Sequence, residues 1–490
     1  MDSAEHLMPQ RRHRSATGII AFAGVCLVLV CWAAAIGRYG GPDEPAHVLR
    51  AHAVAHGDLL GAPASGLPPG YRTVTVPPGL GTGDPACYRH DPARSSGCAV
   101  PEDQERDVSV ATSAGTNPPL YYALVGLPPR MLGRADDPLA YRLSAVALVA
   151  GVLGMVVARL RPRGHGALVL PALVPPSCWF LWSVVNPNAL EIALVALAAT
   201  GIASSGSGEL VARRSSAWWV SLPLAMAVAI RPIAFLWALT VLVLVELHQR
   251  PRTTGGPAAA RRRRSVLWGP VAAATLAVVA WSAWVGLVVD DARTASSGSW
   301  SAAIGVSIGG LPRTGLELVA SMGWLEYWAP WFAVAAWAAA AAVTAATRPH
   351  AASGTWMTVG SALILVPVSF EVVLHERVGH IWQGRYSLPV AAIAIVLALT
   401  SDRSAPHRVS RFVAGTIAGI SACAVIVTFW AMARRYAVGV DGSWWFHGAD
   451  RTTRWLAPGS WVIVHTAVVV LLVGLLARGS TGEPRTGQTT

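Results

Sequence analysis

Two adjacent carboxylates and an imidazole follow directly after the first apolar stretch of the chain, in the segment Pro42–His47 (PDEPAH). Ionisable groups so close to a membrane-spanning stretch are costly and more often functional than incidental. A carboxylate in this position could act as a general base that deprotonates an acceptor hydroxyl. Asp43 and Glu44 are the candidates for this catalytic role. His47 lies four residues after Asp43 and would share one helical face with it.

Three other interpretations of this cluster remain open. The carboxylates could simply cap the positive end of a short helix that begins at Pro42. One of them could form a structural ion pair with Arg231 or Arg385. Together with His47 they could also hold a divalent metal ion, although no second cluster has metal-like spacing. No other cofactor is indicated.

Polar side chains recur at the ends of later apolar stretches, and all fall on the same predicted face of the membrane. The candidates for substrate binding are His47, Asn117, Tyr121, Asn186, Glu191, Arg231, Gln383, Arg385 and Tyr386. Arg231 and Arg385 are permanently charged, fork-shaped donors that suit a phosphate group, but a structural salt bridge fits them equally well. Asn186 could also belong to a tight turn between two helices.

The composition indicates how these residues are positioned. Hydrophobic residues make up 53% of the 490 residues and charged residues only 13%, whereas soluble domains carry about 25% charged residues. We therefore expect an all-α integral membrane protein, a polytopic bundle of about 12 transmembrane helices with a long first extracytoplasmic loop. The expected spans are 17–36, 139–158, 166–185, 189–205, 216–231, 233–248, 266–288, 329–347, 355–374, 386–401, 412–433 and 459–477. Pro175 and Pro176 predict a kink in the third span.

The distribution of arginine predicts the orientation. Arginines are dense in alternate short loops, which the positive-inside rule places in the cytoplasm. The net charge of +12 therefore reflects membrane topology and not nucleic-acid binding, and the run Arg261–Arg264 is expected to be a cytoplasmic linker. The predicted parts are a cytoplasmic tail (1–16), the first transmembrane helix (17–36), an extracytoplasmic loop with interfacial helices (37–138), the transmembrane bundle (139–477) and a second cytoplasmic tail (478–490).

The long first loop contains two cysteines, Cys87 and Cys98. If the loop is extracytoplasmic, a disulfide between them is plausible. Two free thiols are the alternative, because spacing alone does not establish a bridge.

Five motifs together resemble those of the bacterial membrane family called domain of unknown function 2142. They occur in order from residue 42 to about residue 390. Pro42–His47 resembles the family's P-D-E-x-x-H signature. The other matches are Asn117–Tyr122 (N-P-P-L-Y-Y), Asn186–Glu191 (N-P-D/N-G-L-E, with Ala189 replacing the usual Gly), Arg231-Pro232 (R-P) and Gln383–Tyr386 (Q-G-R-Y). The loop with Cys87 and Cys98 is also similar.

That family resembles the GT-C type of integral-membrane glycosyltransferase. The resemblance implies that a first-loop carboxylate is the catalytic base, with Asp43 as first candidate and Glu44 as second. It also implies a polyprenyl-phosphate sugar donor whose phosphate meets Arg231 or Arg385. The expected protein is a multi-pass enzyme of the bacterial plasma membrane that transfers sugar to an envelope glycan or protein acceptor on the extracytoplasmic face.

Two other functions remain as alternatives. The chain could be a membrane transporter or a flippase for lipid-linked saccharides, although its polar groups cluster at one surface and no internal repeat is visible. It could also be a non-catalytic assembly partner for envelope polymers. The sequence has no Gly-rich phosphate loop of the Walker type, which argues against a cytoplasmic nucleotide-driven reaction.

Overall fold

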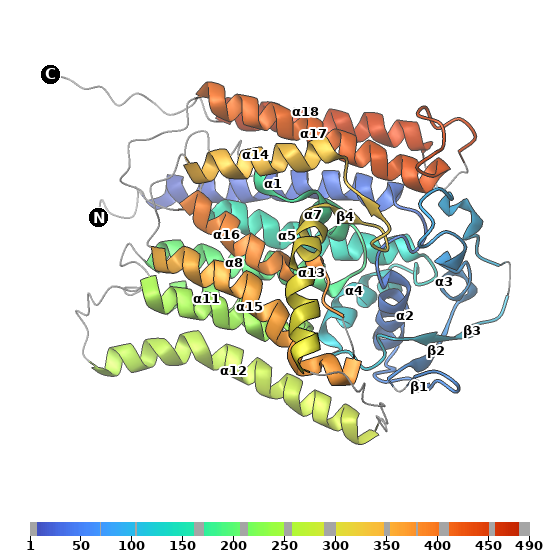
Figure 1. The fold of residues 1–490 in the computed structure, drawn as a ribbon, viewed down its shortest axis with the longest axis horizontal. Helices are drawn as coiled ribbons and strands as arrows, with labels where there is room; N and C mark the ends of the chain where they lie inside the picture. Colours follow the sequence, from blue (N-terminus) through green and yellow to red (C-terminus); the bar gives the residue numbers. More distant parts are fainter. Residues whose placement is uncertain are drawn as a thin grey trace.

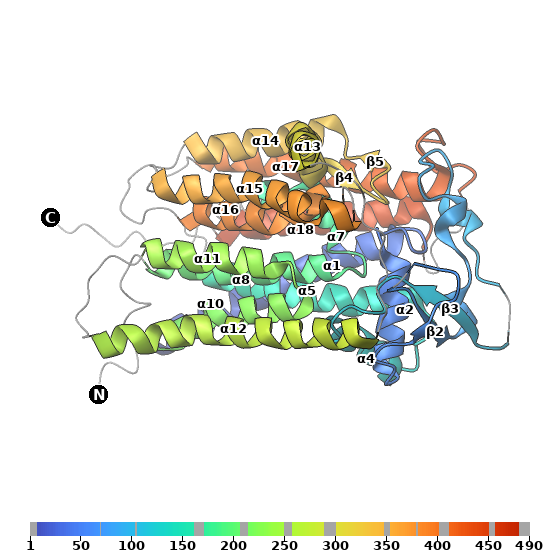
Figure 2. The ribbon, with the colours of Figure 1, turned by 60° about the horizontal axis from the view of Figure 1, so that its bottom comes forward.

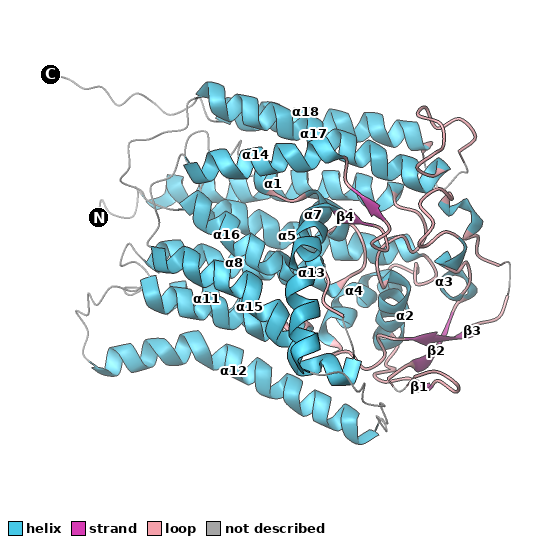
Figure 3. Cartoon of the chain, viewed as in Figure 1, coloured by secondary structure: helices cyan, strands magenta, loops and turns pink. Residues whose placement is uncertain are grey.

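A computed structural model describes residues 7–68, 70–102, 105–160, 171–205, 214–248, 257–288, 300–346, 353–378, 381–400, 411–449 and 456–479. Its described part consists mainly of helices that run side by side, with a smaller cap at one end of the bundle (Figures 1 and 2). The few strands lie in the cap and in one short hairpin (Figure 3). The predicted helical fold with a long first loop is confirmed.

The helices of the bundle match most of the expected spans. They are α1 (Leu7–Ala35), α5 (Pro138–Leu160), α8 (Pro187–Ser205), α10 (Arg214–Ile230), α11 (Ala234–His248), α12 (Pro257–Val288), α14 (Trp331–Ala346), α15 (Ser353–Val378), α16 (Leu388–Thr400), α17 (Arg411–Val438) and α18 (Pro458–Gly479). Among the described residues, α5, α12, α15, α17 and α18 are long and apolar enough to cross a membrane, and several shorter helices are apolar. The total of 12 spans stays a prediction.

Helix α8 is the centre of the bundle. It packs against α5, α10, α11 and α16, and its residues from Pro187 to Ile202 are buried. A helix that is apolar on every side is stable only where neighbours surround it. The start of α8 is therefore held firmly by its neighbours. Asn188 and Glu191 lie in its first turns, and Asn186 directly precedes it.

Three elements differ from the sequence prediction. The described part of the third expected span is not one kinked helix, because the chain leaves the helix at 174–175 and α7 covers only Pro176–Leu181. Successive prolines remove two backbone donors at this point. Arg261–Arg264 belongs to the first turns of α12 and is not a linker. Residues 300–320 form a helix, α13 (Trp300–Ala320), where a loop was expected.

The first loop folds into the cap. It contains α2 (Glu44–Ala55), α3 (Pro78–Gly81), α4 (Leu120–Met131) and an antiparallel sheet of β1 (Ala62–Pro63), β2 (Arg72–Val76) and β3 (Val108–Thr112), in the order β1-β2-β3. Helix α2 packs against α4 and against the two longer strands. Two short 3-10 turns, η1 (Pro85–Cys87) and η2 (Ser96–Cys98), are joined by a disulfide between Cys87 and Cys98.

A buried arginine ties the cap to the last helices of the bundle. Arg435 of α17 donates to Glu326 Oε1 (3.2 Å) and to the carbonyl oxygens of Arg94 (2.6 Å) and Tyr88 (3.0 Å). Glu326 lies between the strands β4 (Ser321–Met322) and β5 (Tyr327–Trp328). The disulfide-closed segment of the cap is thereby fixed on the bundle.

Candidate active site

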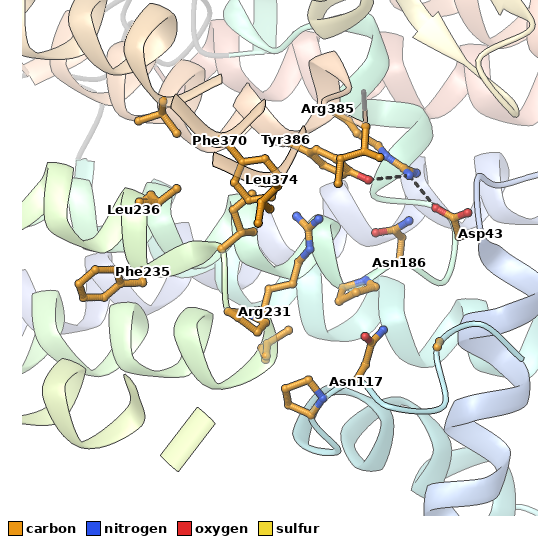
Figure 4. Close-up of a pocket in the computed structure, with 18 of the residues that line it drawn as sticks. Asp43, Asn117, Asn186, Arg231, Phe235, Leu236, Phe370, Leu374, Arg385 and Tyr386 are labelled. Atoms are coloured by element: carbon orange, nitrogen blue, oxygen red, sulfur yellow. Dashed lines mark hydrogen bonds and ion pairs between the residues drawn. The ribbon is translucent and has the colours of Figure 1, made fainter. Parts of the chain in front are cut away.

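A cavity of about 970 Å³ lies where the cap meets the bundle. Its polar end is formed by side chains from widely separated parts of the sequence: Asp43, His47, Asn117, Asn186, Arg231, Arg385 and Tyr386. Its other walls are apolar and come mainly from α11 and α15, with Phe235, Leu236, Leu365, Val366, Phe370, Val373 and Leu374 (Figure 4). The cavity is therefore amphipathic, with charge at one end and hydrocarbon along the rest.

Asp43 presents its carboxylate to this cavity. The residue precedes α2 in a left-handed backbone conformation (φ 60°), and its side chain makes no capping hydrogen bond. Asp43 therefore occupies the N-cap position of α2 but does not cap the helix through a side-chain hydrogen bond. A left-handed conformation is uncommon for residues other than glycine, and Asp and Asn adopt it more readily than most. Half of the side chain is exposed (49%), and Oδ2 lies 2.6 Å from Arg385 Nη2.

Glu44, the second candidate base, does not line the cavity. It is fully buried and forms two hydrogen bonds of 2.7 Å with the guanidinium of Arg142. It also accepts from the backbone N–H groups of Gly41 and Val185, both at 3.0 Å. The bonds to Arg142 and Val185 join the first loop to α5 and to the segment before α8, and this favours a structural role for Glu44.

Arg142 is a residue that the sequence analysis missed. Besides Glu44, it donates to the carbonyl oxygens of Ala33, Ile36 and Gly37, where α1 ends. The signal was present in the sequence, because a charged residue near the start of an apolar span needs a buried partner. Its acidic partner, Glu44, is 98 residues away in sequence.

Arg231 and Arg385 lie on the same aromatic ring. Their guanidinium carbons are 4.8 Å and 5.2 Å from the centre of the Tyr386 ring, within the range of cation–π attraction. Arg231 Nη1 is 2.6 Å from Oε2 of Glu191, a fully buried carboxylate at the start of α8 that also accepts from Asn188 Nδ2 at 2.9 Å. Glu191 stands behind Arg231 and does not line the cavity.

The loop that carries Arg385 is held through its backbone. Glu371 of α15 accepts from the N–H groups of Ile381 (3.0 Å) and Trp382, and Glu317 of α13 accepts from that of Gly384 at 3.1 Å. This loop continues into the 3-10 turn η3 (Gly384–Ser387). Gln383 belongs to the same loop, but its side chain does not line the cavity.

A hydrogen-bonded group of three side chains forms the α2 side of the site. The Tyr122 hydroxyl is hydrogen-bonded to His47 Nδ1 at 3.0 Å, and it also accepts a hydrogen bond from Asn117 Nδ2 at 2.8 Å. His47 and Asn117 line the cavity, and Tyr122 stands behind them. Tyr122 holds their positions, whereas the candidate Tyr121 is buried away from the cavity.

Burial and neighbouring charge set the protonation of the two cavity groups on the α2 side. Burial lowers the pKa of His47 to about 4, so its imidazole is neutral at pH 7. For Asp43, burial alone would raise the pKa. The positive charges of Arg385 and Arg231 and the Arg385 hydrogen bond outweigh it, so the pKa lies below the ordinary value. Asp43 is therefore an anion near pH 7.

No group of three or more His, Cys, Asp or Glu side chains suited to a metal ion occurs among the described residues. The charged partners of the carboxylates at the site are arginines, and each carboxylate faces one: Asp43 with Arg385, and Glu191 with Arg231. Donors of this type bind oxyanions such as phosphate.

Fold and site together define a helical membrane protein with an amphipathic cavity beneath a cap formed by the first loop. The chain belongs to the family described as predicted membrane protein DUF2142, whose model matches residues 26–394. No curated protein matches it. Among solved structures, it is similar to the crystal structure of ArnT from Cupriavidus metallidurans bound to undecaprenyl phosphate, with a TM-score of 0.45 and 14% sequence identity over 95% of this chain and 77% of that chain.

Proposed function

We propose that this protein is a membrane glycosyltransferase of the GT-C type, which takes a sugar from a polyprenyl-phosphate donor on the extracytoplasmic face. The observation that supports this most is the cavity itself. One carboxylate that can accept a proton, two guanidinium groups that can bind a phosphate and a long apolar wall all line a single space.

The two ends of the cavity fit the two parts of such a donor. The polar end carries Arg231 and Arg385, which suit the phosphate. The apolar walls from α11 and α15 suit the first isoprene units. The charges of Asp43, Glu191, Arg231 and Arg385 sum to zero. A bound phosphate would therefore interact with two guanidinium groups that already pair with the carboxylates of Glu191 and Asp43.

The reaction follows from the position of Asp43. Its carboxylate takes the proton of an acceptor hydroxyl while the hydroxyl oxygen bonds to the anomeric carbon of the sugar. The bond between that carbon and the phosphate oxygen breaks on the opposite face, which inverts the configuration. The electron pair leaves with polyprenyl phosphate, whose added negative charge the two arginines stabilise.

The proposed orientation is supported by the ends of the helices. Helix α5 ends at Leu160, next to Arg159, and α12 begins with Arg261–Arg264 in its first turns. Both of these helix ends lie away from the cap (Figure 1). Since arginine-rich ends favour the cytoplasm, the cap and the cavity would face outward, where an activated sugar is carried by a lipid.

Membranes that contain the protein can be incubated with radiolabelled polyprenyl-phosphate sugars. We expect transfer of label to envelope material with the wild type, and none with Asp43→Asn at an equal amount of folded protein. Asp136→Asn is a matched control, because Asp136 is an exposed carboxylate of the same loop outside the cavity. Movement of lipid-linked sugar across vesicles without transfer would instead identify a flippase.

A further inference from the structure

The two arginines of the cavity have their counter-ions on different sides. Glu191, the partner of Arg231, is fully buried and does not line the cavity. Asp43, the partner of Arg385, lines the cavity with half of its side chain exposed. A ligand that enters the cavity can therefore compete with Asp43 for Arg385, but it cannot reach Glu191.

Arg385 also has unused hydrogen-bonding capacity. Its side chain is nine-tenths buried, and only Nη2 is bonded, to Asp43 Oδ2 at 2.6 Å and weakly to the Tyr386 hydroxyl at 3.4 Å. Nε and Nη1 are buried without a hydrogen-bond partner. A buried donor without a partner costs about 1–3 kcal/mol, so this guanidinium favours a further acceptor.

The surroundings of Arg385 allow a change of partner without a change of fold. The backbone of its loop is fixed by Glu371 and Glu317, and its guanidinium rests on the Tyr386 ring. A rotation of the side chain alone can therefore move the donor groups from one acceptor to another.

We propose, on the basis of the proposed function, that Arg385 exchanges Asp43 for the phosphate of the incoming donor, while Arg231 stays in place as the permanent phosphate anchor. The carboxylate of Asp43 is then released to accept a proton only when the donor is bound. The charged and titratable groups that face Asp43 are Arg385 from η3, Arg231 from the α10–α11 turn and His47 from α2.

Two consequences follow from this exchange. When the phosphate binds Arg385 and Arg231, their positive charges no longer stabilise the ionised carboxylate of Asp43. Asp43 then becomes a stronger base. The acceptor hydroxyl can pair with Asp43 only after Arg385 has left it, so the donor binds before the acceptor.

The exchange can be tested with a radiolabelled polyprenyl phosphate that carries no sugar, bound to the purified protein in detergent. Wild type, Asp43→Asn, Arg385→Gln and the double variant are compared. Asparagine suits the left-handed backbone of residue 43 and removes the anionic competitor. We expect Asp43→Asn to bind the lipid ~10-fold tighter, as the loss of a competing charge-assisted hydrogen bond predicts. In the Arg385→Gln background this gain should vanish.

The exchange is supported only if the tighter lipid binding of Asp43→Asn depends on Arg385. An equal gain in both backgrounds would reflect general electrostatics and would overturn the exchange, as would an unchanged affinity of Asp43→Asn. Asp136→Asn, which removes one exposed charge from the same loop, should stay within about twofold of wild type. If Arg385→Gln does not fold, Arg385→Lys replaces it, and the gain should then be reduced.

The same experiment separates this inference from the proposed function. Binding of the polyprenyl phosphate without the Arg385-dependent gain would leave the donor site standing and overturn only the exchange. No binding of the lipid by wild type would overturn both. Inorganic phosphate should bind more weakly than the polyprenyl phosphate, because it leaves the apolar walls uncovered. Equal binding of the two would contradict a lipid donor.

Discussion

At the level of single residues, the two neighbouring carboxylates of the PDEPAH motif have different surroundings. Asp43 has a left-handed backbone and points its carboxylate into the cavity, whereas Glu44 opens α2 and is buried against Arg142. The sequence places both next to the membrane but cannot rank them, because the difference depends on one backbone angle and on a partner 98 residues away.

Substitution of Glu44 by Gln should destabilise the protein, because it leaves the buried guanidinium of Arg142 without its counter-charge. Loss of one partner of a buried ion pair typically costs about 3–5 kcal/mol. Thermal unfolding in detergent should therefore show a clearly lower Tm for Glu44→Gln and a smaller change for Asp43→Asn, because Asp43 is half exposed and asparagine keeps an oxygen acceptor for Arg385. Equal Tm values for Glu44→Gln and wild type would contradict the structural role of Glu44.

His47 should make the stability depend on pH. Its pKa in the folded protein is about 4 because of burial, against about 6.5 in an unfolded chain. The unfolded state therefore binds a proton first as the pH falls, so the stability contribution of neutral His47 is present above pH 6.5 and is lost as the pH falls toward 4.

Thermal unfolding measured across this pH range should show a smaller loss of stability at low pH for His47→Gln than for wild type. A part of the loss should remain, because burial also lowers the pKa of His52 to about 4. Parallel curves for the two proteins would contradict a buried neutral His47.

At the level of elements, the site depends on a helix that the sequence did not reveal. Helix α13 crosses the direction of the bundle helices (Figure 1), and its Glu317 holds the Arg385 loop through the backbone of Gly384. Long apolar stretches were predictable because each has the composition of a span. Helix α13 was not, because its exposed apolar residues are interspersed with polar ones and with Pro312.

Gly384→Ala should displace the Arg385 loop. An added Cβ would lie 2.5 Å from the carbonyl oxygen of Thr314 and closer still to the amide nitrogen of Leu318, both of which are backbone atoms of α13 that cannot give way cheaply. We expect a loss of about 1–3 kcal/mol in unfolding free energy together with a loss of transfer activity. Gly360→Ala in α15, where the new methyl group meets open space, should be neutral or slightly stabilising.

At the level of the whole molecule, the cap and the bundle form the site jointly. The cap supplies Asp43, His47 and Asn117, and the bundle supplies the two arginines. The sequence predicted that these residues act together, because all of them fall at the ends of expected spans on the same face of the membrane. The sequence could not show how the cap is fixed, since Arg435 donates to the carbonyl oxygens of Arg94 and Tyr88, 341 and 347 residues away in sequence.

Labelling of single cysteines in intact cells should establish the orientation. Leu67 of the cap is 45% exposed, and the side chain of Arg264 in α12 is 68% exposed. A membrane-impermeant maleimide should label Leu67→Cys in intact cells and Arg264→Cys only after lysis, with the unmodified protein as background. The reverse pattern would place the cavity on the cytoplasmic side and contradict the proposed donor.

The central claim is that Asp43 is the base of a sugar transfer in this cavity. The most direct measurement is the rate at which the purified protein transfers sugar from a polyprenyl-phosphate donor, compared between wild type and Asp43→Asn preparations with the same Tm. We predict a rate lower by about 10²–10⁴-fold for Asp43→Asn, the usual contribution of a general base. Transfer by Asp43→Asn at the wild-type rate would contradict the account.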